Sequence, residues 1–356
     1  MSHRAAVTAR KRAVLAAAVA ALVGGAATGC GGSSPAATSS ASSAPVPLVV
    51  YSAQGYDKAM TGAFQKATGI PTKLVDDSTG PLLARVQAEQ GNPAWGVLWV
   101  DGDAAFAALD KAGMLVKGFE PNVTLNAAGQ AVVPADKSYV PTGLTVTAAV
   151  VYDSTKTTTP PTSWQELLTP AWKGAVGMND PSVSGPTYPF VAGMFSQLGG
   201  DTQGQAFYTG LKSNGLHVFQ TNGDTLHALQ TGQIKVALVQ SSAGIAAGIK
   251  TPHLKTAYLP KVTSLPSVIG IDGKAPAQVQ AEAKQFASFV LSAAGQQVML
   301  TGDRNGDSLY WPIVSGVQPD PELPALSTVP TQAIDPYTWG PKEGTINAWF
   351  TNTIVR

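Results

Sequence analysis

The 356-residue chain contains one cysteine, Cys30, so it cannot form an internal disulfide. It is also poor in charge. Without residues 1–29 it carries 19 Lys and Arg against 22 Asp and Glu, a net charge of −3. Nucleic-acid binding requires a strongly basic face, so we expect no nucleic-acid partner. After residue 29 no apolar run reaches the roughly 20 residues of a membrane span, which predicts a soluble folded body.

Motifs of common hydrolases and nucleotide-binding enzymes are also missing. The segment nearest to a Gly-x-Ser-x-Gly elbow, residues 240–244, begins with Gln. There is no phosphate loop and no His-Glu-x-x-His, and the histidines are isolated. These absences favour a binding protein that is not an enzyme and holds no metal or cofactor. A lipid-anchored hydrolase of the cell envelope and an adhesive lipoprotein stay open. A catalytic pair in a cleft would indicate the first, and a closed cleft without polar groups the second.

The first 29 residues have the pattern of a secretory signal. Four basic residues precede an apolar run over residues 13–23, and small residues follow. The segment Ala27-Thr28-Gly29-Cys30 resembles the lipobox of bacterial lipoproteins, which implies cleavage before Cys30 and a lipid on its sulfur. Residues 30–47, rich in Ser, Ala, Gly and Pro, predict a flexible tether. We therefore expect an extracytoplasmic protein anchored to the cell membrane, with a plain secretory signal as the alternative.

The body repeats the order of strand, polar turn and helix. Strands are expected at residues 48–51, 72–75 and 96–100, and each leads into a helix. The second half repeats this plan around strands at 173–178 and 236–239. Such alternation predicts an α/β protein of two lobes, each with a mostly parallel sheet covered by helices on both faces. The β-branched run 141–153 reads as one extended strand that leaves the first lobe.

Polar turns follow these strands, and ligands of open α/β sheets bind beyond the carboxyl ends of the strands. Several turns also precede a helix, whose free N–H groups and partial positive charge suit an anion. Ordinary helix capping is the alternative reading for each. The candidate ligand-binding residues are Ser52, Gln54, Ser78, Thr79, Gly80, Asp101, Ser182, Ser184, Gly185, Thr187, Asn222, Ser241, Ser242 and Arg304.

Arg304 lies in a loop with three polar neighbours, Asp303, Asn305 and Asp307. It could pair with an oxyanion, or form a surface salt bridge to Asp303 or Asp307. The acidic spacing is similar to half of a calcium loop, but position 314 is Val where the closing Glu should stand, so we expect no calcium site. Nearby Tyr310 could line a cleft or pack in the core, and packing is expected for Trp311.

Four stretches together resemble the extracellular solute-binding proteins of ABC importers, in the branch of ferric-ion, 2-aminoethylphosphonate, sugar-phosphate and thiamine binders. They begin at Leu48, Thr162, Asn222 and Ala283, and the second and third contain the fairly specific segments 164–174 and 222–232. The resemblance implies a two-lobed type II periplasmic-binding fold with a hinge. It also implies a monomer that delivers a small solute to a permease and its ATPase. Lobe one would comprise residues 48–143 and 266–318, and lobe two residues 144–265 and 319–356.

The same resemblance bears on the ligand. Ferric-ion binders place adjacent tyrosines after the strand that corresponds to residues 237–239, where this chain has Ser241, Ser242 and Ala243. Fe(III) requires several anionic oxygen ligands, and serine hydroxyls are neutral. We therefore predict a small polar or anionic organic solute of the phosphonate or phosphate-ester kind, with ferric ion as the alternative.

Overall fold

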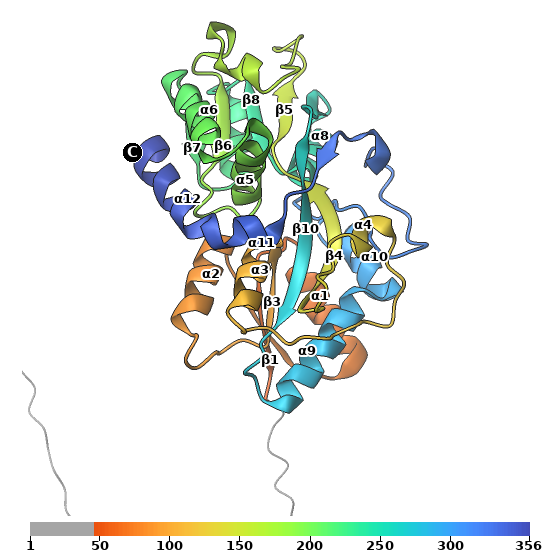
Figure 1. Ribbon diagram of the computed structural model, residues 1–356. Coiled ribbons are helices and arrows are strands. Elements are labelled where there is room, and N and C mark those ends of the chain that lie inside the picture. Colours follow the sequence, from red (N-terminus) through yellow and green to blue (C-terminus); the bar gives the residue numbers. More distant parts are fainter. Residues whose placement is uncertain (1–45) are drawn as a thin grey trace, which may run out of the picture. The chain divides into compact units, whose positions relative to one another are not determined.

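The computed structural model describes residues 46–356, which form two mixed sheets covered by helices (Figure 1). The predicted signal segment, Cys30 and residues 30–45 of the predicted tether lie outside the described residues. We name the first sheet with its helices the first lobe, and the second sheet with its helices the second lobe. In the described part of the chain no helix is long and apolar enough to cross a membrane.

The first sheet has the strand order β11-β10-β3-β1-β2, and β4 pairs with β10. The strands β1, β2 and β3 are parallel, whereas β10 runs antiparallel to β3 and β4. The strand bounds are β1 Leu48–Ser52, β2 Thr72–Asp76, β3 Val97–Asp101, β4 Tyr139–Val146, β10 Val262–Ile271 and β11 Thr331–Gln332. The helices are α1 Asp57–Thr68, α2 Thr79–Ala88, α3 Ala104–Lys111, α4 Ala127–Gln130, α9 Ala277–Val290 and α10 Ala293–Thr301.

The second sheet has the order β7-β6-β8-β5-β9. The pairs of β6 with β7 and β8 are parallel, and those of β5 with β8 and β9 are antiparallel. The strands are β5 Ala149–Asp153, β6 Val176–Asn179, β7 His217–Phe219, β8 Val236–Val239 and β9 Leu254–Ala257. The helices are α5 Thr187–Leu198, α6 Asp201–Ser213, α7 Asn222–Thr231 and α8 Ser241–Lys250, with 3-10 turns η1 Gln165–Leu168 and η2 Pro170–Trp172.

The structure confirms two α/β lobes, and five of the nine strand pairs are parallel, so both sheets are mixed. Strands joined through helices are parallel as predicted, but β10 pairs antiparallel with β3 and β4, and β5 pairs antiparallel with β8 and β9. The run 141–153 is not one strand. It breaks into β4 and β5 at Ala148, whose φ is 51°. The predicted lobe boundaries at 143/144 and 265/266 fall inside β4 and β10.

The core of the first lobe centres on aromatic side chains. Trp99 on β3 is fully buried, and its indole N–H donates to Thr142 Oγ1 at 3.1 Å and to Ser267 Oγ at 3.0 Å. Tyr56 packs edge-on against Trp99, with ring centroids 5.1 Å apart. Trp311 is buried as expected and donates to Pro324 O. Burial of each large side chain contributes about 1.5–3 kcal/mol, so these residues fix the strands that carry the polar turns.

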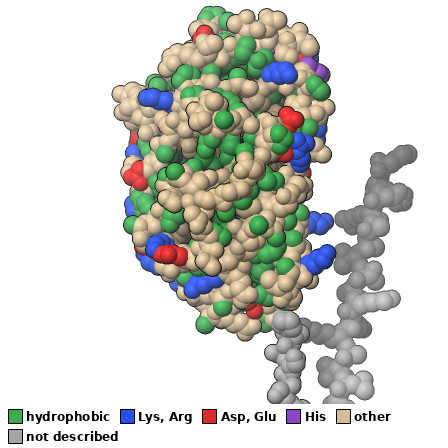
Figure 2. Space-filling model, turned by 90° about the vertical axis from the view of Figure 1, so that its right-hand side faces the viewer, with side chains coloured by type: hydrophobic (Ala, Val, Ile, Leu, Met, Phe, Trp, Pro, Cys, Tyr) green, Lys and Arg blue, Asp and Glu red, His purple; other side chains and the backbone are tan. Residues whose placement is uncertain are grey.

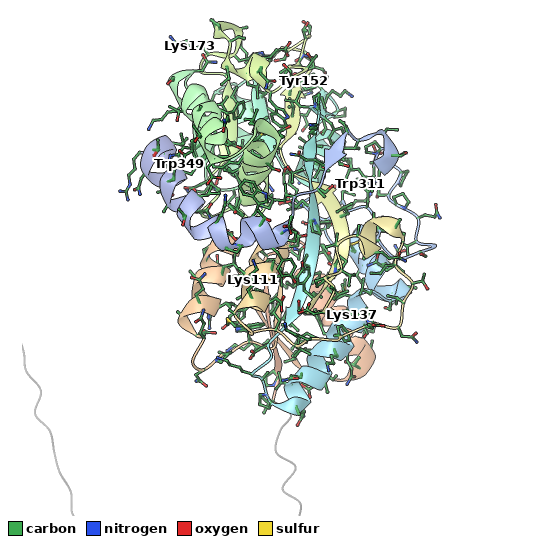
Figure 3. All side chains as sticks on the ribbon, in the orientation of Figure 1. Lys111, Lys137, Tyr152, Lys173, Trp311 and Trp349 are labelled. Atoms are coloured by element: carbon green, nitrogen blue, oxygen red, sulfur yellow. The ribbon has the colours of Figure 1, made fainter. Side chains whose placement is uncertain are left out.

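The C-terminal segment contacts both lobes. It contains η3 Leu326–Thr328, α11 Pro336–Trp339, η4 Gly340–Lys342, α12 Glu343–Phe350 and the π turn η5 Thr351–Val355. On the first lobe, Tyr337 OH donates to Asp110 Oδ2 at 2.9 Å, and α11 packs on α3. On the second lobe, Trp349 packs on Phe195 with centroids 5.8 Å apart. Figure 3 labels Lys111 on α3, against which α11 packs, and Trp349 on α12 within this segment.

Charged side chains on the face shown in Figure 2 are scattered singly or in small groups, and most of that face is apolar or uncharged. This arrangement agrees with the low charged fraction of the sequence, 13%.

Candidate functional site

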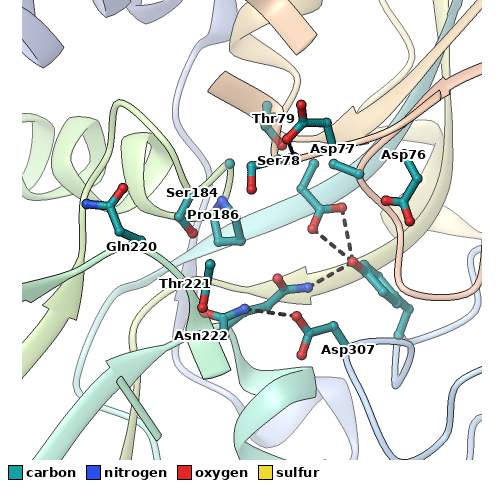
Figure 4. Close-up of a pocket in the computed structure, with 15 residues that line it drawn as sticks. Asp76, Asp77, Ser78, Thr79, Ser184, Pro186, Gln220, Thr221, Asn222 and Asp307 are labelled. Carbon is teal, nitrogen blue, oxygen red and sulfur yellow. Dashed lines mark hydrogen bonds between the residues drawn. The ribbon is translucent and has the colours of Figure 1, made fainter. Parts of the chain in front are cut away.

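A polar cavity of about 380 Å³ lies between the lobes, at the carboxyl ends of strands from both sheets. Turns after β2, β3, β6, β7 and β8 contribute to it, together with the loop that follows α10 (Figure 4). The fold therefore places a pocket where open α/β sheets bind ligands. Its lining residues are Ala53, Asp76, Asp77, Ser78, Thr79, Asp101, Ser184, Gly185, Pro186, Gln220, Thr221, Asn222, Gln240, Asp307 and Tyr310.

The wall from the first lobe is built by strand ends. Asp76 and Asp101 are the last residues of β2 and β3, which lie on either side of β1. Between β2 and α2 the chain turns at Asp77, whose Oδ1 accepts a hydrogen bond from the Ser78 N–H at 2.7 Å. Thr79 then begins α2 and is buried. The short turn directs carboxylates and hydroxyls into the same cavity.

The wall from the second lobe depends on Asn179, the last residue of β6. Its side-chain amide donates to Ser184 Oγ at 3.0 Å and to Asn222 Oδ1 at 2.7 Å. It thereby fixes the turn before α5 relative to the first residue of α7. Thr221 caps α7 in a reciprocal pair with Asp224, so its backbone is held at the start of the helix. No side chain caps α5, so the expected capping role of the turn 182–187 is absent.

The deepest part of the pocket is a hydrogen-bonded group around Asp101. Gln54 Nε2 donates to Asp101 Oδ1 at 2.9 Å, and Tyr310 OH donates to Oδ2 at 2.8 Å. Gln240 Nε2 donates to the Tyr310 oxygen at 2.8 Å. Burial raises the pKa of Asp101 to about 7, against the lowering effect of the hydrogen bonds from Gln54 and Tyr310.

Asp307 adds a second, half-buried carboxylate at this end. Its Oδ2 accepts from Asn222 Nδ2 at 3.1 Å, and its backbone N–H donates to Asp303 Oδ2 at 3.3 Å. Burial raises the pKa of Asp307, opposed by the bond from Asn222. In residues 46–356 no group of three or more His, Cys, Asp or Glu is arranged to hold a metal ion.

Three polar bridges join the lobes around the pocket. The Gly80 N–H donates to Val183 O at 3.1 Å, Asn222 binds Asp307, and Gln240 binds Tyr310. Glycine is required at the first bridge, because a Cβ on Gly80 would lie 2.0 Å from Ser182 O. A Cβ on Gly185 would lie 2.3 Å from Thr79 Oγ1 in the other lobe. The structure is therefore a closed arrangement of the two lobes.

Six of the predicted site residues line the pocket: Ser78, Thr79, Asp101, Ser184, Gly185 and Asn222. Another five lie behind the wall without lining it. These are Ser52, whose Oγ accepts from Gln54 N, Gln54 beside Asp101, Gly80 at the bridge, Ser182, whose Oγ donates to Asp180, and buried Thr187 at the start of α5.

The remaining three are placed elsewhere. Ser241 Oγ lies 2.7 Å from Thr145 Oγ1 on β4, so its hydroxyl faces the strands that join the lobes. Ser242 is fully buried, and its Oγ has no hydrogen-bond partner. Arg304 pairs with Asp320 at 2.7 Å, which differs from both predicted partners. None of the three lines the pocket.

Sequence reasoning missed most of the acidic wall. Asp76 and Asp77 lie in the predicted polar turn after β2 but are not among the candidate ligand-binding residues. Two adjacent acidic residues directly after a strand would have indicated them. Gln240 directly follows β8 and could have been chosen over Ser241 on the same ground. Asp307 and Tyr310 come from a loop distant in sequence, and of the two only Tyr310 was a candidate to line a cleft.

The fold and the pocket define a class, namely a two-lobed solute-binding protein of the type II periplasmic-binding fold. A family match over residues 59–331 shows that the chain belongs to the bacterial extracellular solute-binding proteins. Proteins of this type bind small solutes and deliver them to ABC permeases, and the chain is a solute-binding protein of the ABC-importer type.

Relatives bear out this assignment. A putative 2-aminoethylphosphonate-binding periplasmic protein of Salmonella paratyphi A is 25% identical over 288 residues, covering 78% of this chain and 80% of the relative. The major ferric iron-binding protein of Neisseria meningitidis is 26% identical over 272 residues, covering 73% and 80%. The fold matches the periplasmic binding protein AfuA from Actinobacillus pleuropneumoniae, with bound fructose-6-phosphate, at a TM-score of 0.76 and 18% identity over 87% of this chain and 98% of that one. These relatives are binding proteins, not enzymes.

Proposed function

We propose that the protein captures a small polar solute in the pocket between its lobes, outside the cytoplasm, and passes it to the permease and ATPase of an ABC importer. The observation that carries this proposal is a polar cavity enclosed by bridges from both lobes. Bridges of this kind can form only when the lobes are closed, so binding and closure are coupled. The protein acts as a carrier and catalyses no reaction.

One side of the pocket suits the oxygens of a phosphonate or phosphate ester. Figure 4 shows Ser184, Gln220 and Thr221 together on that side. The starts of α2 and α7 meet the cavity there, through Thr79 and Asn222. Helix N-termini and hydroxyls donate hydrogen bonds to oxyanions without a fixed positive charge. The name of the Salmonella relative, a phosphonate binder, supports the same chemistry for this chain.

Ferric ion is the second candidate, because the Neisseria relative is named for it. Fe(III) prefers several anionic oxygens that converge on one point. The described residues contain no such group of three, and Ser241 and Ser242 stand where the ferric-ion binders have tyrosines. The phenol Tyr310 is already bonded to Asp101 and Gln240. The organic solute is therefore the better match to this pocket.

We further propose that residues 1–29 are a secretory signal and that Cys30 carries the lipid that anchors the mature protein to the cell membrane. The basic and apolar segments before Ala27-Thr28-Gly29 support this reading. Residues 30–47 then serve as the tether, and the protein acts as a monomer beside its permease. Replacement of Cys30 by Ala should move the protein from the membrane fraction to the soluble one.

Thermal unfolding with added solutes tests the function. 2-Aminoethylphosphonate at 100 times its Kd should stabilise the purified protein by about 2.7 kcal/mol. The double variant Thr79→Val with Ser184→Ala should lose this stabilisation, because it removes two hydroxyls from the oxyanion side. Ser196→Ala, at an exposed serine of α5 outside the pocket, is the control. Stabilisation by Fe(III) citrate together with no response to 2-aminoethylphosphonate or fructose-6-phosphate would sink the organic-solute proposal.

A further inference from the structure

The charge of the pocket is one-sided. Four carboxylates line it, from Asp76, Asp77, Asp101 and Asp307, whereas no Lys, Arg or His is among the lining residues. Arg304 cannot offset them, because it is paired with Asp320. A solute with only negative charge would therefore enter a pocket that repels it. An oxyanion side alone does not explain this acidic wall.

Asp76 and Asp307 lie away from Ser184, whereas Asp77 lies beside Ser78 and Thr79 (Figure 4). In Figure 4, Asp76 and Asp307 lie opposite Gln220 and Ser184. Tyr310 OH donates to Asp101 Oδ2 at 2.8 Å, and Asn222 connects the two sides through its bond to Asp307. The pocket thus has two chemically different ends within one cavity of about 380 Å³. That volume is at the small end for ligand pockets, so a solute of few heavy atoms would touch both ends.

Two of the four carboxylates are shielded from water to different extents, Asp101 almost completely and Asp307 partly. Asp101 is 7% exposed, and burial raises the pKa of both Asp101 and Asp307. Carboxylates are costly to bury without a cation or sufficient hydrogen bonds. Beside them, Gln54 is 2% exposed and its Oε1 has no hydrogen-bond partner. Gln54 lies behind the lining, so what this end of the pocket itself lacks is a positively charged donor.

We propose that the bound solute carries a primary ammonium group, which the end formed by Asp101, Asp307 and Tyr310 receives. An ammonium has three N–H donors and would satisfy acceptors on several sides at once. Its oxyanion would then lie at the hydroxyl end, so the preferred solute is a short zwitterion. This inference rests on the proposed function, and it identifies the acidic end as the part of the site that determines specificity.

Isothermal titration with three probes tests it. 2-Aminoethylphosphonate has both groups, ethylphosphonate has only the oxyanion, and 1,2-diaminoethane has only ammonium groups. We expect 2-aminoethylphosphonate to bind at least about tenfold tighter than ethylphosphonate, since hydrogen bonds to charged groups contribute this much or more. Equal affinity of the two phosphonates would overturn the ammonium proposal and leave the proposed function intact. Binding of the diamine alone would support the ammonium end and refute the oxyanion end, and no binding of any probe would refute both.

Asp307→Asn separates a charge effect from a structural one, because Asn keeps the shape and an oxygen that can accept from Asn222. We expect the affinity for 2-aminoethylphosphonate to fall about tenfold or more, while ethylphosphonate binds no weaker than before. A structural defect would weaken both probes alike, and that result would overturn the role of Asp307. Asp201→Asn, at an exposed aspartate paired with Lys342, is the matched control and should change neither affinity.

Discussion

Gly80→Ala should weaken ligand binding without lowering the stability of the folded protein. Gly80 is the second residue of α2, and a Cβ there would lie 2.0 Å from Ser182 O and 3.1 Å from Val183 Cα. Both atoms belong to the backbone of the second lobe, so no side-chain rotation can relieve the overlap. Non-bonded heavy atoms need about 3.5 Å or slightly less, which means that the lobes must separate by more than about 1 Å at this edge.

The separation removes the bond from Gly80 N–H to Val183 O and loosens the pocket beside it. Coupling between closure and binding is typically about 1–3 kcal/mol, so we expect the affinity for 2-aminoethylphosphonate to fall roughly 5–150-fold. The unliganded protein should not lose stability, because Ala is about 1 kcal/mol better than Gly inside a helix and offsets the lost hydrogen bond.

Titration calorimetry and thermal melts of the same sample measure the two effects. Gly62→Ala is the control, since Gly62 is an exposed residue of α1 and a Cβ there meets nothing within 4 Å. It should raise stability by about 1 kcal/mol and leave affinity unchanged. If Gly80→Ala binds as tightly as the parent protein, the contact between the lobes at Val183 is not part of the bound state.

Two further predictions concern charged groups. Because burial raises the pKa of Asp101 to about 7, the native protein keeps a proton that the unfolded chain releases above about pH 4. The resulting stability is complete below pH 4 and is lost as pH rises to 7, with a slope of up to about 1.4 kcal/mol per pH unit. Denaturant titrations at several pH values should show that the Asp101→Asn variant lacks this slope. The groups that face Asp101 are Asp307 and Tyr310. If the free energies of unfolding of parent and variant change with pH in the same way, the slope does not come from Asp101. Separately, Arg304→Ala should cost about 1–3 kcal/mol of stability, because it leaves the buried carboxylate of Asp320 without its charged partner, and should leave solute affinity unchanged. A loss of affinity would place the arginine in the pocket after all.

The sequence was informative where local patterns determine structure. Strand ends followed by polar turns pointed to Ser78, Asp101 and Asn222, which all line the cavity, because the carboxyl ends of the parallel strands share an edge. It could not show the direction of side chains. Ser241 follows β8 as expected, but α8 begins at that residue and turns its hydroxyl toward Thr145.

Contacts between distant segments were beyond local reasoning. Tyr310 reaches the pocket because Trp311 and Leu144 exchange two backbone hydrogen bonds, which tie the loop after α10 to β4. No periodicity in the loop signals this pairing. The break at Ala148 was also hidden, since alanine gives no warning of a left-handed backbone. Asp307 lies in the same loop as Tyr310, so the acidic end of the pocket depends on the pairing of that loop with β4.

The C-terminal segment limits how far the protein can open. Two strand connections already join the lobes near Ala148 and Lys261. The segment adds a third joint at the surface, where Tyr337 holds α3 and Lys212 Nζ donates to Thr353 O. Two lobes joined at three separated points cannot rotate far about the two strand connections while the C-terminal segment remains bound to both lobes. Solute must therefore enter through a narrow opening between the lobes, or the C-terminal segment must first shift along one lobe. Either route admits small solutes and excludes polymer chains and bulky complexes.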